Sequence, residues 1–517
     1  MQKVRKADLK AVTSSGKNAE ISGVLTQDIA HLQKLFERCS DFVCREFQIG
    51  SSKAAIFYFD GMVKTETVND EILRSLILET RMAKSEQTEK NRLTDFLEQH
   101  ALTVGEIERV DTWTEALAAL YVGDTLLLLD GCEEAFVLNS KGFPQRSVDK
   151  AGNEKVLRGP EEAFNETLRV NTALIRKRVK SYNLKMESLT LGVNTQTKVV
   201  LAYLEDVANP SIVAEAKKRL ESLQGVKGIM ESSGIEQVIE DNPQSVFPQI
   251  QYSERPDRVC QAMTEGRIAI LVDGSPNVLI IPALLVQLLQ SPDDYYNRAK
   301  AGTFMRFIRY IGIAVALLFP SLYVAITSYH PEMLPLNLLL SIAAAREGIP
   351  FPAFVEALLM ALAFELLREA SLRMPSAIGN TIGIVGALVI GEAAVSANLV
   401  APQMIVVVSL TAIGSFTLPS IEASYPVRLL RFPLMILAAI LGLYGVMLGV
   451  IAILIHLIKL KSFGYPYLAP LAPLSVSGAK DMFIRRSRKD VRQNVLFQQP
   501  PQYSVGRSLD GTKIIPE

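Results

Sequence analysis

Residues 374–400 read MPSAIGNTIGIVGALVIGEAAVSANLV, an apolar stretch long enough to cross a bilayer, with one carboxylate, Glu392, well inside it. Glycines recur along this stretch at Gly379, Gly383, Gly386 and Gly391. Small residues at such spacing let a neighbouring helix approach closely. An ionisable side chain at membrane depth usually faces a partner charge or a water-filled path. The stretch therefore predicts a packed membrane helix with Glu392 at a pore or a helix interface.

Around this stretch the chain divides into two unlike parts. Its 517 residues hold 54 Lys and Arg against 54 Asp and Glu, but residues 1–301 are charged and mixed, whereas residues 304–460 are apolar. This contrast predicts a cytosolic α/β domain followed by an all-α transmembrane domain of about four to five helices. The balanced charge gives no electrostatic case for nucleic-acid binding. The basic start precedes no apolar run, so we expect the amino-terminal domain to stay in the cytoplasm.

Two halves of the soluble part share a pattern. Strands are predicted at residues 53–63 and 199–207, and GDTLLLLD at 123–130 matches GRIAILVD at 266–273 at nearly the same offset. We expect one helix to open at Asn69 and Asp70 after the first strand, and another at Asn209 and Pro210 after its counterpart.

These matches predict two similar α/β subdomains, residues 30–150 and 151–300, behind a flexible extension of residues 1–29. Chance similarity between generic strand and turn patterns is the alternative, because short apolar runs are weakly diagnostic.

Neither half carries a set of catalytic groups. Asp130 and Asp273 each precede glycine, a setting that favours turn residues over general acids. Ser477 to Lys480 fits Ser-x-x-Lys, but so short a pattern in a tail is weak evidence. The four cysteines form no Cys-x-x-Cys pair and are expected to be free thiols, and the four histidines show no metal-ligand spacing. We expect no enzyme activity, no cofactor and no metal.

Five apolar segments are candidate spans, at residues 307–327, 352–373, 378–399, 403–418 and 432–458. Basic residues that flank the start of the first segment, including Arg306 and Arg309, and those after Leu460 place both ends in the cytoplasm, which requires an even number of crossings. The charged segment 352–373 is the weakest candidate and is predicted to be interfacial or re-entrant, with burial inside an oligomer as the alternative.

That segment forms a membrane-embedded charged helix, and its charges are Glu356, Glu365, Arg368, Glu369 and Arg373. Glu365 with Arg368, and Glu369 with Arg373, are spaced to pair along one helix face.

The candidate pore or helix-interface residues lie in a predicted helical hairpin that turns near residues 398–402. They are Asn380, Thr381, Gly383, Gly386, Gly391, Glu392, Val395, Ser396, Asn398 and Val400. For the Ser, Thr and Asn side chains, hydrogen bonds to backbone or to a neighbouring helix are the alternative. Gly445 and Gly449, four residues apart in the last segment, are predicted to pack helices.

Several motifs agree with one known family. They are PFP at residues 350–352, FELLREA at 364–370, MPS at 374–376, TIGIVG at 381–386 and KSFGYPY at 461–467. With these motifs the chain resembles the membrane core of the spore germinant receptor A subunits, the GerA family. Asn398 stands where most relatives are expected to have glycine, although asparagine also tolerates a left-handed turn.

The resemblance implies a non-enzymatic subunit in the inner membrane of bacterial endospores. It implies a homo-oligomeric ring around an ion-conducting path, in contact with membrane lipid, and partners in a transporter-like B subunit and a lipoprotein C subunit. A sporulation-stage paralogue that forms a channel without sensing nutrient, or a non-conducting scaffold, would have much the same sequence. The tail, residues 461–517, is expected to be cytosolic, basic and partly disordered.

Overall fold

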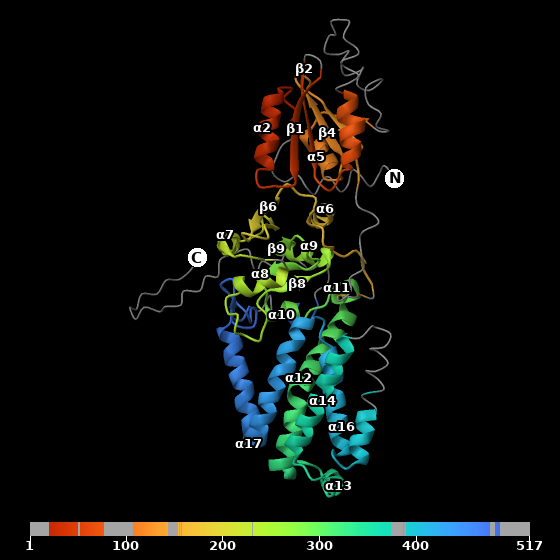
Figure 1. Cartoon of the computed structure of the whole chain (residues 1–517), viewed down its shortest axis with the longest axis vertical. Helices are drawn as coiled ribbons and strands as arrows, with labels where there is room; N and C mark the ends of the chain where they lie inside the picture. The colour runs from red at the N-terminus through yellow and green to blue at the C-terminus, as the bar shows by residue number, and fades with distance from the viewer. Residues whose placement is uncertain are drawn as a thin grey trace, which may run out of the picture.

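The computed structural model describes residues 20–49, 52–76, 107–142, 154, 156, 158–229, 231–373, 386, 389–475 and 481–485. Three parts follow one another along the long axis of the molecule (Figure 1): a first α/β subdomain, a second α/β subdomain and a bundle of helices, here called the helical domain. The predicted fold class, two similar α/β subdomains followed by an all-α region, is confirmed.

Each subdomain contains one five-stranded antiparallel sheet. Subdomain 1 contains α2 (Leu25–Leu35), β1 (Phe42–Ile49), β2 (Ser52–Phe59), η2 (Thr67–Arg74), β3 (Ile107–Val110), α5 (Trp113–Leu120), β4 (Thr125–Leu129) and β5 (Ala135–Leu138). Subdomain 2 contains α6 (Leu168–Arg178), β6 (Leu184–Leu191), β7 (Thr197–Leu204), α7 (Pro210–Ser222), η4 (Leu223–Gly225), α8 (Ser232–Ile239), β8 (Gln251–Ser253), α9 (Pro256–Thr264), β9 (Ile268–Val272), β10 (Val278–Ile281), α10 (Leu285–Leu288) and α11 (Asp293–Tyr296).

The strand orders of the two sheets agree with the predicted similarity of the subdomains. The first sheet runs β1-β2-β4-β5-β3 and the second β6-β7-β9-β10-β8, which is the same order for equivalent strands. Apolar side chains cover both faces of each sheet, as expected for strands that are buried on both sides.

Asp130 and Asp273 hold equivalent positions in the two subdomains. Asp130 Oδ1 accepts a hydrogen bond from the backbone N–H of Leu25 at 3.3 Å, and Asp273 Oδ1 accepts one from Leu168 at 3.2 Å. Each bond joins residues 105 apart in the chain. Both aspartates are therefore turn residues, as predicted. Their carboxylates also accept hydrogen bonds from otherwise unpaired backbone N–H groups in the first turn of α2 or α6.

Two helix starts test the capping predictions. Asn209 caps α7, since its Oδ1 accepts from the backbone N–H of Ser211 at 3.0 Å, with Pro210 at the first helical position. The prediction for Asn69 and Asp70 is wrong, because helix already begins at residue 65 and both lie inside η2.

The amino-terminal boundary also differs from the prediction. Ile21, Leu25 and Ile29 are buried in the core of subdomain 1, so residues 20–29 are not an extension. Residues 1–19 lie outside the described part of the chain.

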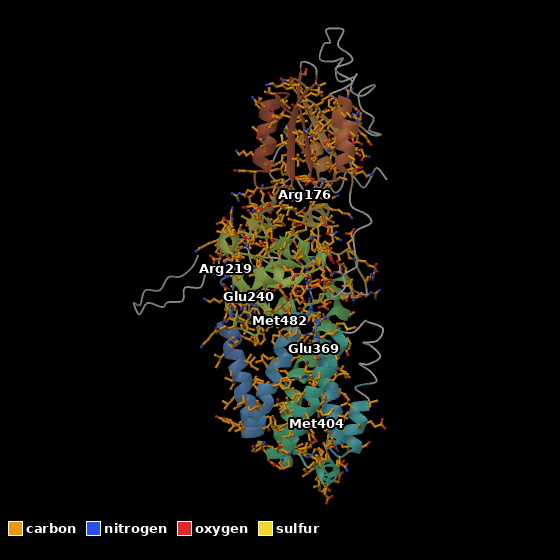
Figure 2. All side chains as sticks on the ribbon, in the orientation of Figure 1. Arg176, Arg219, Glu240, Glu369, Met404 and Met482 are labelled. Carbon is orange, nitrogen blue, oxygen red and sulfur yellow. The ribbon has the colours of Figure 1, made fainter. Side chains whose placement is uncertain are left out.

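A buried ion pair joins the subdomains. Arg176 of subdomain 2 is fully buried, donates to Asp41 of subdomain 1 at 2.8 Å and lies 4.1 Å from the ring centre of Phe59. Figure 2 shows Arg176 between the two sheets. Backbone hydrogen bonds from Ser40 to Met186 and from Met186 to Arg38 add to this contact.

The helical domain contains α12 (Ala299–Tyr329), η5 (Pro331–Met333), α13 (Leu336–Arg346), α14 (Ala353–Arg373), α16 (Pro402–Phe416) and α17 (Ile421–Lys459). Residues 389–396 are also helical. In the described part of the chain, α12 and α17 are long and apolar enough to cross a membrane.

Helix α17 is a hairpin of two arms that reverses at Gly442, whose φ is 62° and ψ −142°. A Cβ on Gly449 of the second arm would lie 2.4 Å from Leu434 of the first, and Gly445 meets the backbone of Leu437. The arms form a V in Figure 1. The prediction of one span at residues 432–458 is wrong, because the turn divides it, whereas the packing role predicted for Gly445 and Gly449 is confirmed.

Both ends of α17 lie against subdomain 2. Ala423 near its start and Leu457 near its end share an apolar cluster with Phe247 and Leu288. At the far end, the Tyr329 hydroxyl of α12 donates to the Ala439 carbonyl at 2.5 Å. The helical domain therefore has a near end at subdomain 2 and a far end beside α13.

The segment after α17 returns to subdomain 2. It forms β11 (Lys461–Ser462) and β12 (Tyr465–Pro466), and the Ser462 hydroxyl donates to the Gln249 carbonyl at 2.6 Å. Residues 461–475 are therefore packed, because apolar side chains such as Phe463 and Tyr467 join the core of subdomain 2 and its junction with the helical domain. Residues 481–485 are ordered as well, with Met482 and Arg485 buried, so the prediction of disorder after residue 475 is wrong for them. Residues 476–480 and 486–517, with the whole Ser-x-x-Lys pattern, lie outside the described part.

Candidate functional site

The charged groups of α14 occupy three environments. Glu356 is completely buried at the far end, Glu365 is partly buried, and Glu369 is exposed at the near end. Figure 2 places Glu369 close to subdomain 2, and Met404 of α16 toward the far end. The sequence marks α14 as charged, but tertiary contacts decide what each carboxylate does.

Glu356 joins α13, α14 and the start of α16. Its Oε2 accepts from the backbone N–H of Ala401 at 2.9 Å, and its Oε1 lies 3.2 Å from Nη2 of Arg346. Ala401 is the residue before α16, so the carboxylate also lies at the positive end of that helix. The interaction with three elements explains how a carboxylate is tolerated at this depth.

Glu365 joins α14 to the first arm of α17. Arg431 donates to its Oε1 at 2.5 Å, and Arg428 donates to both of its oxygens, in one case at 3.2 Å. The predicted partner, Arg368, instead lies over the ring of Phe416 of α16 at 5.2 Å. The predicted pair of Glu369 with Arg373 is present at 2.7 Å.

Arg428 and Arg431 were not predicted as partners of Glu365. They are three residues apart and therefore share one face of the helix. Two arginines on one face of an apolar helix require a carboxylate on a neighbouring helix, and this signal could have predicted their pairing with Glu365.

Of the candidate pore positions, the structure describes Gly386 and those within residues 389–400. Glu392, Ser396 and Asn398 are exposed, Val395 is half-buried, and Gly391 and Val400 are buried. Within the described residues, Glu392 has no hydrogen bond or ion pair. Asn380, Thr381 and Gly383 lie outside the described part of the chain.

The glycines of this segment contact neighbouring helices. A Cβ on Gly386 would lie 2.7 Å from Leu367 of α14, and one on Gly391 would lie 3.8 Å from Ile405 of α16. The helical stretch ends at Asn398, whose φ of 51° confirms the predicted left-handed turn. The segment thus packs through its glycines and exposes Glu392 on the opposite side.

A second buried ionic group, the Asp294 cluster, consists of Asp294, Arg306 and Arg309. Asp294 is 1 % exposed, and its Oδ2 lies 3.1 Å from Arg306 Nε and 3.0 Å from Arg309 Nη1. The two arginines belong to α12, where sequence alone indicates a basic membrane flank. Their actual role is to attach the first long helix to α11 of subdomain 2.

Residues 481–485 close over this cluster. The Tyr310 hydroxyl donates to the Met482 carbonyl at 2.9 Å, and Arg485 donates to the Tyr295 carbonyl at 2.7 Å. The end of the described chain is therefore attached to both α11 and α12.

Two further predictions concern the cysteines and the possible metal ligands. Cys39, Cys44, Cys132 and Cys260 are free thiols, as predicted. In the part of the chain that the structure describes, no three His, Cys, Asp or Glu side chains are placed to hold a metal ion.

Comparison with known proteins identifies the family. The profile of the Bacillus/Clostridium GerA spore germination protein matches residues 30–495. This chain belongs to the GerA family. It is 41 % identical over 500 residues to the uncharacterized membrane protein YfkQ of Bacillus subtilis (strain 168), which covers 95 % of this chain and 94 % of YfkQ.

Other GerA-family relatives have names that refer to germination. Spore germination protein KA of Bacillus subtilis (strain 168) is 40 % identical over 468 residues, which are 90 % of this chain and 85 % of that protein. The crystal structure of the N-terminal domain of the A subunit of the Bacillus megaterium spore germinant receptor GerK3 matches with 32 % identity and a TM-score of 0.40, over 52 % of this chain and 98 % of that domain. The GerA match spans both subdomains and the whole helical domain, so Glu356, Glu365, Glu392 and the Asp294 cluster all fall inside it.

Proposed function

We propose that this GerA-family chain is a membrane subunit of a spore germinant receptor whose helical domain forms or gates an ion-conducting path. The observation that carries the proposal is the environment of Glu392. The carboxylates of Glu356 and Glu365 are paired inside the bundle, whereas Glu392 is exposed on an apolar helix without a partner among the described residues. An ionisable group at this depth needs water, a second subunit or a lumen around it.

The arrangement supports a homo-oligomer in which the Glu392 face meets other copies or a central lumen. Small residues beside this carboxylate suit close packing around a narrow path that opens and closes by dewetting. We place the complex in the inner membrane of the spore, with a transporter-like B subunit and a lipoprotein C subunit as partners, because relatives over nearly the whole chain are named as spore germination proteins.

The helical domain suggests six crossings. They are α12, α14, the segment before residue 400, α16 and the two arms of α17. The charges of α14 no longer speak against a crossing, because Glu356 and Glu365 are paired inside the bundle. The two arms of α17 count as two crossings, which gives the even number that two cytoplasmic ends require.

Single cysteines test this topology in a background with the four native cysteines replaced by serine. Glu332→Cys, at the far end, is expected to react with a membrane-impermeant maleimide on intact cells. Lys461→Cys, beside subdomain 2, is expected to react only after permeabilisation. Equal labelling of both on intact cells would contradict the six-crossing arrangement.

Ion flux tests the proposed path. Liposomes containing the purified protein, alone and with co-expressed B and C subunits, are compared for wild type, Glu392→Gln and the control Glu369→Gln. We expect Glu392→Gln to change cation flux several-fold, because it removes the charge nearest the path, and Glu369→Gln to leave flux unchanged. No flux in any combination, from folded and oligomeric protein, would favour a non-conducting scaffold.

A further inference from the structure

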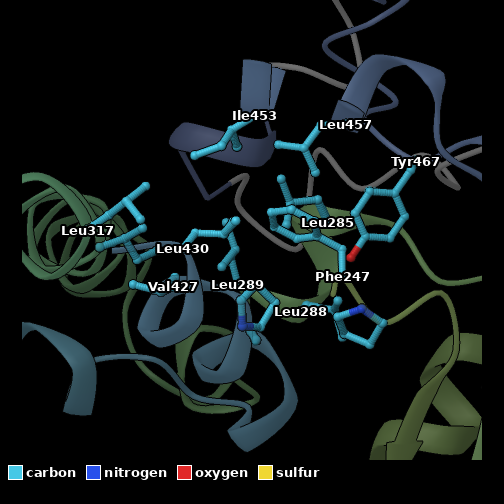
Figure 3. Close-up of a pocket in the computed structure, with 14 residues that line it drawn as sticks. Phe247, Leu285, Leu288, Leu289, Leu317, Val427, Leu430, Ile453, Leu457 and Tyr467 are labelled. Atoms are coloured by element: carbon cyan, nitrogen blue, oxygen red, sulfur yellow. The ribbon is translucent and has the colours of Figure 1, made fainter. Parts of the chain in front are cut away.

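A partly enclosed apolar cavity of about 130 Å³ lies where subdomain 2 meets the helical domain. Its wall comes from the loop before β8, from α10, from α12, from both arms of α17 and from the segment after β12. Figure 3 shows the lining side chains gathered around this space, among them Leu288, Val427, Leu457 and Tyr467. Six separate segments of the chain thus converge on one cavity.

All of the lining side chains except that of Tyr467 are apolar. The Tyr467 ring is completely buried, and its hydroxyl points toward the other lining side chains in Figure 3. Within the part of the chain that the structure describes, this hydroxyl has no hydrogen-bond partner. A buried hydroxyl without a partner is unfavourable, and natural proteins keep few of them.

A lone water molecule does not suit this cavity. A buried water needs two to four polar partners, and the lining side chains offer one hydroxyl. By contrast, an apolar cavity of roughly 150 Å³ engineered into another protein stays dry and binds benzene. The space at the junction therefore matches an apolar molecule of about six heavy atoms.

We infer that this cavity binds a small neutral molecule with an apolar body of about benzene size and one hydrogen-bond acceptor, which the Tyr467 hydroxyl contacts. The molecule is neutral because an ion in an apolar wall would lose its hydration without compensation. It carries an acceptor because burial raises the pKa of Tyr467, so the phenol keeps its proton and donates.

Occupancy of the cavity would strengthen the junction. Val427 and Leu457 belong to opposite arms of α17, and Leu288 belongs to subdomain 2, so one ligand contacts all three. A molecule that binds only when these parts are together stabilises the docked arrangement by mass action. The inference goes beyond ion conduction and does not depend on it.

Cyclohexanone and methylcyclohexane are the probes, because they are similar in size and only the ketone has an acceptor. The full-length protein in lipid nanodiscs is titrated with each, and the unfolding temperature is recorded. We expect a saturable rise with both probes in wild type. Tyr467→Phe is expected to weaken the binding of cyclohexanone by about two- to tenfold, which is the effect of one hydrogen bond. The binding of methylcyclohexane is expected to stay unchanged.

Filling the cavity provides the second test. Val427→Phe is expected to abolish the response to both probes, and the control Ile458→Phe, at a 58 % exposed position of the same helix, to keep it. If Val427→Phe has no unfolding transition, Ala423→Val replaces it. An equal response in wild type and the filled variant, or an unchanged ketone preference in Tyr467→Phe, would overturn the inference.

Discussion

At the scale of single residues, side chains with similar sequence surroundings differ strongly in burial. Glu356 and Glu369 belong to one helix, yet the first is completely buried and the side chain of the second is 58 % exposed. The sequence predicts both as charges on a membrane helix, and the i,i+4 pair of Glu369 with Arg373 follows from spacing alone. The partners of Glu356 come from α13 and from the residue before α16, which no local pattern specifies.

Glu356→Ala is expected to destabilise the protein by about 3 kcal/mol, because it leaves the Arg346 guanidinium and the Ala401 N–H without their acceptor. Glu369→Ala, which removes an exposed pair, is expected to cost less than about 1 kcal/mol. Unfolding of both variants in the same detergent measures the difference. Equal losses would show that the Glu356 pair contributes no more than a surface pair.

Glu236 of α8 is expected to make the stability of the protein depend on pH. Burial raises its pKa from 4.5 to about 7, and the neighbouring Glu240 carboxylate adds to the effect. The folded protein therefore keeps this proton up to a higher pH than the unfolded chain, so the carboxyl group favours folding at low pH. That contribution is lost as the pH rises from about 4.5 to about 7.

Glu236→Gln is expected to remove this part of the pH dependence and to raise the unfolding temperature above pH 7. Glu231→Gln, at an exposed position in the same region, is the control and is expected to leave the profile unchanged. Parallel unfolding profiles of wild type and Glu236→Gln between pH 4.5 and pH 8 would contradict the assignment.

At the scale of elements, the strands and the duplication could be predicted, whereas the reversal in α17 could not. Period and turn residues define strands locally, and a shared offset relates the two copies. Residues 440–450 contain Gly442, Gly445 and Gly449 in an apolar run, and nothing local distinguishes the turn from the two packing positions. Tertiary contacts decide which glycine forms the turn, because Gly442 lies against Tyr329 and His330 of another part of the chain.

Gly442→Ala is expected to destabilise the helical domain by about 1–3 kcal/mol, since φ 62° with ψ −142° is a conformation that side chains disfavour. An added Cβ would also lie 2.9 Å from the His330 ring. Leu441→Ala, at a neighbouring position that is 43 % exposed, is the control. Unfolding in nanodiscs gives the comparison.

The hairpin itself is tested by cross-linking Leu434→Cys to Gly449→Cys in a background without other cysteines. Replacing the leucine removes the atoms that a Cβ at position 449 would meet, so a disulfide is expected to form. A continuous helix would separate the positions by about 22 Å and prevent the bond. Absence of the cross-link from folded protein would exclude the hairpin.

At the scale of the whole molecule, the composition of the chain separates soluble from apolar parts, but it does not say how they are attached. Arg306 and Arg309 follow the pattern of a basic flank beside a membrane helix. In the structure they are buried and point back to Asp294 of α11. The Asp294 cluster thus attaches the first long helix directly to the soluble part of the chain.

Asp294→Ala leaves two buried guanidinium groups without their carboxylate, and we expect a loss of about 3–5 kcal/mol from the junction. The effect should be local, because the sheet of subdomain 1 contacts neither α11 nor α12. Hydrogen exchange of the full-length protein measures this: residues 293–310 are expected to lose protection while β2 and β4 keep theirs. Asp206→Ala, at an exposed position of subdomain 2, should change neither region. If β2 and β4 lose protection together with residues 293–310, the molecule unfolds as one unit, and the Asp294 cluster contributes to overall stability rather than forming a separable joint between the soluble part and the helices.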